Sequence, residues 1–135
     1  MNSFFDNPSL RPLLLLVGRA LLSVMFIIGG FGKIGGYAGT AAYMTANGVP
    51  SILLPLVIVT ELGGGLALLA GWQTRLVAFL LAGFTVLASL IFHIDWSAPM
   101  QMQNFLKNMA VAGGFLVLMS TGAGRYSVDA ARSAP

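Results

Sequence analysis

Six polar or charged side chains interrupt the apolar stretches of this chain or lie at their ends. They are Arg19, Lys33, Glu61, His93, Lys107 and Asn108. An ionisable group inside hydrocarbon costs about 2.5–3.5 kcal/mol on insertion scales, so such residues are candidates for function by default. A carboxyl, a guanidinium and an amide could together bind the polar head group of a ligand or pass protons. We therefore take these six residues as a candidate ligand-binding set.

Glu61 has the strongest claim to function within this set. With a rise of about 1.5 Å per residue, it lies roughly 15 Å into a hydrocarbon core of about 30 Å, at its middle. A glutamate is too short to reach the lipid head groups from that depth. The alternative interpretation is a purely structural Glu61 that is hydrogen-bonded or protonated.

The sequence predicts that polar groups from several helices lie at successive depths and form a polar staircase. Its members are Arg19, Glu61, Asn108, Lys107 and His93. Helical side chains lean toward the N-terminus of their own helix. This lean favours a contact of Glu61 with Asn108 or Lys107, although Arg19 is also long enough to reach it. In the structural alternative, Arg19 extends to the inner head groups, and Lys33, Lys107 and His93 simply end their helices at the interface.

Four apolar stretches must position these side chains, at about residues 13–32, 51–71, 76–92 and 105–121. About 20 residues suffice to cross a bilayer as a helix. The stretches do not alternate as strands do and are too few for a barrel. The short turn between the second and third makes those two helices antiparallel neighbours. The sequence thus predicts one all-α domain over residues 1–135, an integral membrane four-helix bundle with antiparallel up-down topology. A short interfacial helix is expected around residues 40–46.

The composition fits a chain whose solvent is lipid. Of its 135 residues, 57% are hydrophobic and 8% are charged, whereas a soluble domain carries about 25% charged residues. This excludes a soluble enzyme, a disordered tail and a nucleic-acid module. The chain has no cysteine, which excludes disulfides, Cys-ligated zinc and iron–sulfur clusters. We expect no metal site.

The basic residues predict an orientation. All five arginines lie on one side of the expected bundle, namely Arg11, Arg19, Arg75, Arg125 and Arg132, and the other side carries Lys33 and Lys107. The positive-inside rule then places both termini in the cytoplasm.

Small residues form a second pattern. Glu61 is followed by three consecutive glycines at residues 63–65, and the first apolar stretch ends with glycines at positions 29, 30 and 32. Small residues at such spacing let helix backbones approach closely in lipid. The alternative is that they leave room for a flat ligand beside Glu61.

Taken in order, these motifs resemble the DoxX family of small bacterial membrane proteins. The similar segments are Gly18-Arg19, Gly29-Gly30-Phe31-Gly32-Lys33, Gly48-Val49-Pro50, Glu61-Leu62-Gly63-Gly64-Gly65, Thr74-Arg75, His93, Lys107-Asn108 and Gly122 to Asp129. Ala123 stands where relatives often have proline. The resemblance covers nearly the whole chain. It implies a multi-pass inner-membrane protein with four helices, from a family linked to quinone-coupled oxidation.

The resemblance leaves several functions open. The first is an accessory subunit or quinone-associated component of a membrane oxidoreductase system, with a polar intramembrane site around Glu61. A bound quinone is the one electron carrier that this cysteine-free chain could hold. The alternatives are a structural or assembly subunit of a membrane complex and a small proton- or solute-coupled carrier. The expected partners are the lipid bilayer and either an oxidoreductase subunit or further copies of this chain, with no nucleic acid.

Overall fold

The computed structural model describes residues 2–133, and every regular element in that range is a helix. The separate helices are α1 (Asn2–Phe5), α2 (Leu10–Gly35), α3 (Tyr37–Ala46), α6 (Thr74–Phe92), α7 (Gln101–Thr121) and α8 (Val128–Ser133). Four consecutive pieces form one further helical segment, namely η1 (Ser51–Leu53), α4 (Leu54–Ile58), η2 (Val59–Gly63) and α5 (Gly64–Ala70). The all-α prediction is confirmed. Helix α3 occupies the place of the expected interfacial helix.

Three segments are long and apolar enough to cross a membrane, and they span Leu10–Gly35, Ser51–Ala70 and Thr74–Phe92. The fourth long helix, α7, has 21 residues. Its first half carries five polar or charged side chains, which are Gln101, Gln103, Asn104, Lys107 and Asn108. A fourth membrane crossing by α7 therefore stays a prediction.

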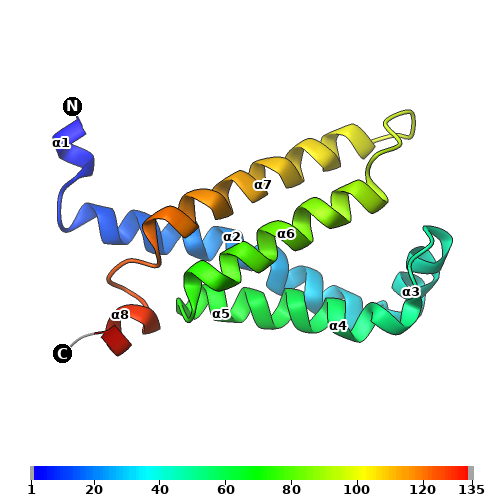
Figure 1. Cartoon of the computed structure of the whole chain (residues 1–135), viewed down its shortest axis with the longest axis horizontal. Coiled ribbons are helices and arrows are strands. Elements are labelled where there is room, and N and C mark those ends of the chain that lie inside the picture. Colours follow the sequence, from blue (N-terminus) through cyan, green and yellow to red (C-terminus); the bar gives the residue numbers. More distant parts are fainter. Residues whose placement is uncertain (1, 134–135) are drawn as a thin grey trace.

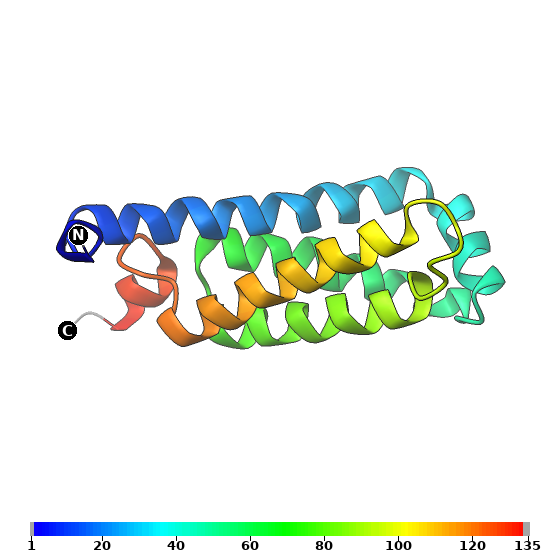
Figure 2. The ribbon, with the colours of Figure 1, turned by 90° about the horizontal axis from the view of Figure 1, so that it is seen from above.

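The long segments form two pairs (Figure 1). Helices α6 and α7 form one hairpin, and α2 lies along the segment from α4 to α5. The two pairs lie close together at the end that holds both termini and α8, and they diverge toward α3 and the α6–α7 loop. Figure 2 also places both termini at the same end. We call this the termini end and the opposite one the α3 end.

Glycines let α2 approach the second segment closely. A methyl group on Gly30 would lie 2.9 Å from Cβ of Leu62, and one on Gly65 would lie 2.9 Å from Cγ1 of Ile27. Real Cβ atoms do not approach so near, so only glycine fits at these two crossings. The interpretation of these glycines as packing residues is therefore correct for Gly30 and Gly65.

The second segment changes its helical pitch where Glu61 lies. Residues Val59–Gly63 form a π-helical turn between α4 and α5. Such turns widen the backbone by one residue and occur frequently at functional sites. The change of pitch therefore singles out Glu61 independently of its charge.

Candidate functional site

Glu61 forms an ion pair with Lys33 across the contact between α2 and η2. Lys33 Nζ lies 3.0 Å from Oε1 and 2.9 Å from Oε2 of the carboxylate. The side chain of Glu61 is 10% exposed, whereas that of Lys33 is 30% exposed. The carboxylate thus has a charged partner in the apolar part of the molecule.

This pairing corrects the contacts predicted for Glu61, which were with Asn108, Lys107 or Arg19. Arg19 lies level with Leu69, to which it donates a hydrogen bond. With a rise of about 1.5 Å per residue along each helix from that level, Lys33 lies only about 9 Å farther toward the α3 end than Glu61. Because α2 and η2 are antiparallel, the N-terminal lean of each side chain also turns the two toward one another. The same lean, applied to Lys33, would have found the pair in the sequence.

Gly29 leaves space for the carboxylate one turn below Lys33. A methyl group at Gly29 would lie 3.2 Å from Oε2 of Glu61 and 3.9 Å from Nζ of Lys33. The distance to Oε2 is tighter than most real contacts of a Cβ atom, whereas the distance to Nζ is an ordinary van der Waals contact. Any larger residue at this position would therefore press on the ion pair.

The ion pair lines a cavity of about 440 Å³ between the diverging helix pairs. Small-molecule sites in proteins commonly occupy about 300–1,000 Å³. Apolar side chains from α2, α3, α4 and α6 make most of the wall. The polar lining residues are Lys33, Thr40, Tyr43, Thr60, Glu61, Thr85, His93 and Asn108. The cavity suits a molecule with an apolar body and a small polar head.

Two further predicted polar residues, Asn108 and His93, line this cavity, and each makes a hydrogen bond to a neighbouring side chain. Asn108 Nδ2 donates to Ser89 Oγ at 3.0 Å, which joins α7 to α6. His93 ends α6, and its Nδ1 lies 2.6 Å from Oε1 of Gln101. Four predicted residues, Lys33, Glu61, His93 and Asn108, therefore line one space.

An aromatic contact joins α3 to α6 beside the cavity. The rings of Tyr43 and Phe92 stack with their centroids 5.2 Å apart, and both residues line the cavity. Sequence reasoning did not single out Tyr43. Its only signal in the sequence was its place in the short helix before residue 47. A tyrosine at a membrane interface is usually an anchor, so this place did not indicate a role at a cavity.

Arg19 serves a different purpose at the termini end. Its side chain is 2% exposed, and it donates to three backbone carbonyl oxygens. The distances are 2.5 Å to Ala123, 2.6 Å to Tyr126 and 3.3 Å to Leu69. Arg19 thus ties the chain after α7 to α2 and α5. The interpretation in which it extends to the lipid head groups is wrong, because the side chain is buried and both of its terminal nitrogens donate inside the protein.

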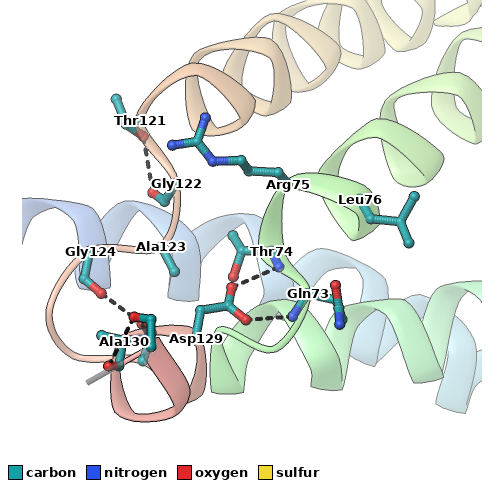
Figure 3. Close-up of a pocket in the computed structure, with 12 residues that line it drawn as sticks. Gln73, Thr74, Arg75, Leu76, Thr121, Gly122, Ala123, Gly124, Asp129 and Ala130 are labelled. Atoms are coloured by element: carbon teal, nitrogen blue, oxygen red, sulfur yellow. Dashed lines mark hydrogen bonds between the residues drawn. The ribbon is translucent and has the colours of Figure 1, made fainter. Parts of the chain in front are cut away.

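The C-terminal tail is held at the same end by Asp129 (Figure 3). Its carboxylate accepts hydrogen bonds from the backbone N–H of Gln73 at 2.8 Å and of Thr74 at 2.9 Å, at the start of α6. Partial burial alone would raise the pKa of this carboxyl. The hydroxyl and N–H of Thr74, the N–H of Gln73 and the charge of Arg19 outweigh burial and lower that pKa.

A second cavity, of about 420 Å³, lies between Asp129 and the turn after α7 (Figure 3). Arg75 lines it, and its Nη1 donates to the carbonyl oxygens of Met119 and Ser120 at 2.8 and 3.2 Å. The guanidinium thereby satisfies carbonyls at the C-terminal end of α7, which have no partner within the helix. The polar groups around this space hold the tail and the helix ends in place.

Lys107 belongs neither to the residues that line the cavity at the α3 end nor to those that hold the tail at the termini end. It is exposed, and among the described residues it makes no ion pair and no side-chain hydrogen bond. The five residues of the predicted staircase therefore do not form one series. Glu61, Asn108 and His93 line the cavity at the α3 end together with Lys33, whereas Arg19 lies at the termini end and Lys107 lies on the surface.

Comparison with known proteins identifies the family of this chain. The DoxX family model matches residues 14–94. The chain is 51% identical to inner membrane protein YqjF of Escherichia coli (strain K12), over 84% of this chain and 88% of the relative. It is 37% identical to inner membrane protein YphA of the same strain, over 93% and 95%.

A third relative is more distant. CatD of Bacillus subtilis (strain 168), whose name describes it as a proposed oxidoreductase, is 30% identical over 56% of each chain. No solved structure matches this chain. The matched family model covers more than half of the sequence and agrees with the apolar helices. The chain therefore belongs to the DoxX family and is a multi-pass protein of the bacterial inner membrane.

Proposed function

We propose that this protein is an accessory, quinone-associated component of a membrane oxidoreductase system. The observation that carries the proposal is a mostly apolar cavity of about 440 Å³ with an ion pair, Lys33–Glu61, in its wall. A quinone has the matching shape, because a flat polar ring is attached to an apolar chain. The distant similarity to CatD supports the same class of function.

The residues present fit a quinone head group. Lys33 has three N–H donors, of which Glu61 uses two in this structure. The third can donate to a ring carbonyl oxygen, and the carboxylate can accept from a ring hydroxyl. When bound, a quinone supplies the electron-carrying capacity that a chain with no cysteine and one histidine lacks.

The proposed orientation places the termini end in the cytoplasm, with α7 as a fourth membrane crossing. The arginines belong to the first half of α2, the start of α6 and the segment around α8, which lie toward that end, and the positive-inside rule favours the cytoplasm for it. The cavity would then lie in the outer half of the bilayer. A tag on either terminus should be reached by a membrane-impermeant label only after the inner face is opened.

Quinone retention tests the proposal. The protein is purified in native-lipid nanodiscs, and quinone is extracted and counted per chain. The double variant Lys33→Gln with Glu61→Gln removes both charges and leaves no unpaired one. We expect the wild type to retain quinone above the lipid background, and the double variant to retain about tenfold less.

Lys107→Gln is the matched control, because Lys107 is an exposed lysine outside the cavity. It should retain quinone at the wild-type level. Quinone at the lipid background in the wild type would overturn the proposal. Proton-driven solute flux that depends on Glu61, in a protein without bound quinone, would instead favour the carrier function.

A further inference from the structure

We infer that the cavity selects its ligand by hydrogen-bond polarity and holds the reduced, hydroxyl-bearing form of a quinone more tightly than the oxidised form. This inference rests on the proposed function and names the ligand form that the same site prefers. A quinone ring carries two carbonyl oxygens that only accept, whereas a quinol ring carries two hydroxyl groups that also donate. The preferred form therefore depends on whether the free polar groups of the cavity wall are mainly acceptors or mainly donors.

The α7 wall offers an acceptor. Ser89 is fully buried, and its hydroxyl donates to the carbonyl oxygen of Thr85 at 2.9 Å. Its oxygen can then only accept from Asn108, which turns the Nδ2 group of the amide toward it. Oδ1 of Asn108 has no hydrogen-bond donor among residues 2–133 and is not enclosed. Ser89 thus fixes the amide so that an acceptor is left for the ligand.

Threonine hydroxyls in the wall have the same polarity. Thr40 donates to Gly36 O at 3.0 Å, Thr60 to Leu56 O at 2.8 Å and Thr85 to Leu81 O at 2.7 Å. Each hydroxyl has a single hydrogen, which its own helix takes. What these side chains can still offer a ligand is an oxygen lone pair.

His93 extends the pattern. Oε1 of Gln101 is an amide oxygen and can only accept, so Nδ1 of the imidazole donates to it. In the neutral ring, Nε2 is then an acceptor. The donors left to a ligand are fewer, namely one N–H of Lys33, the second N–H of Asn108 Nδ2 and the hydroxyl of Tyr43, which donates no hydrogen bond within residues 2–133.

The ion pair decides the charge of the preferred ligand. Lys33 compensates the carboxylate of Glu61, so the pair adds no net charge that would attract a free cation. A wall rich in acceptors and neutral as a whole favours a neutral donor, as a quinol is. Ser89 and Asn108 are accordingly specificity residues: Asn108 touches the ligand and Ser89 positions the amide.

The test compares the two forms of one probe. Decylubiquinone and its chemically reduced quinol are titrated anaerobically into protein in nanodiscs, and dissociation constants are measured for wild type, Ser89→Ala and Asn108→Leu. One hydrogen bond corresponds to roughly two- to tenfold in affinity. We expect the wild type to bind the quinol at least that much more tightly, and both variants to lose the preference mainly through weaker quinol binding.

Ser89 does not touch the ligand. If its role were merely structural, Ser89→Ala would weaken the binding of quinone and quinol equally. Thr121→Ala is the control, since Thr121 lies outside this cavity, and it should keep the preference. Equal affinity, or tighter binding of the quinone, would overturn this inference and leave the proposed function standing. Failure of both forms to bind would overturn the proposed function itself.

Discussion

The two ends of this bundle use charged side chains in opposite ways. At the termini end, Arg19, Arg75 and Asp129 bond to backbone groups that would otherwise lack partners. At the α3 end, Lys33 and Glu61 bond to each other and border a cavity. A charge in an apolar chain therefore does not by itself identify a functional site. A structural charge is bonded to backbone groups of the fold, whereas a charge at a ligand site keeps donors or acceptors that a ligand can use.

Replacing Arg19 should break the termini end most severely. Arg19→Met leaves three carbonyl oxygens without their donor, two of them bonded at 2.5 and 2.6 Å. We expect a loss of about 3–5 kcal/mol in the free energy of unfolding, since buried charge-assisted bonds are lost and their partners stay unsatisfied. Steric trapping or denaturant titration in micelles measures it.

Arg19→Lys should recover only part of this stability, because an ammonium group cannot reproduce the planar fork of a guanidinium. Arg11→Met is the matched control, since Arg11 is exposed on the same helix, and it should change stability by less than about 0.5 kcal/mol. A stable Arg19→Met variant that had lost only quinone would reverse the roles assigned to the two ends.

Gly29→Ala, at the α3 end, should lower ligand binding and leave stability nearly unchanged, in contrast to Arg19→Met. The added methyl group would press on Oε2 of Glu61 at 3.2 Å and shift the ion pair. We expect quinone retention to fall about fivefold, a loss of about 1 kcal/mol of binding. The free energy of unfolding should change by less than about 1 kcal/mol, because alanine favours the helix.

Gly32→Ala provides the control for this change, because a methyl group at Gly32 meets nothing within 4 Å. It should leave both quinone retention and stability near the wild-type values. Unaltered retention in Gly29→Ala would show that the carboxylate position does not matter for the ligand.

Acid should loosen the termini end slightly. The pKa of Asp129 is lowered in the folded protein, so its stabilising effect is complete above the unfolded value of about 3.9 and is lost as the pH falls through the lower folded value. Asp129→Ala should cost about 1 kcal/mol at neutral pH, as the loss of a helix cap does, and should remove that acid-dependent part.

Hydrogen exchange at the backbone N–H of Gln73 and Thr74 reports on this cap directly. Asp6→Ala is the control, because Asp6 is exposed and caps no helix among the described residues. Exchange at Thr74 that is the same with and without Asp129 would show that the tail is not held by this carboxylate.

The helices could be predicted from the sequence, because long apolar runs separated by glycines and prolines determine where they begin and end. The expected boundaries for the second run, 51–71, lie within one residue of the segment Ser51–Ala70. Glu61 could be singled out because a short carboxylate in the middle of an apolar run needs compensation. The π-helical turn that carries it was not predictable from the run.

The contacts were harder to predict than the elements. The register of α2 against the second segment depends on the crossings at Gly30 and Gly65, and this register decides that Lys33, and not Arg19, reaches Glu61. The partners of Arg19 are carbonyl oxygens of a tail far along the chain, which no side-chain pattern marks. Long-range backbone contacts of this kind require the folded structure.

The most direct test of the central claim is an experimental density map of the protein in nanodiscs supplied with quinol. We expect a flat density in the cavity, beside the Lys33–Glu61 pair and within hydrogen-bond distance of Asn108. Density confined to the lipid-facing surface, with Glu61 turned toward acyl chains and away from Lys33, would contradict it.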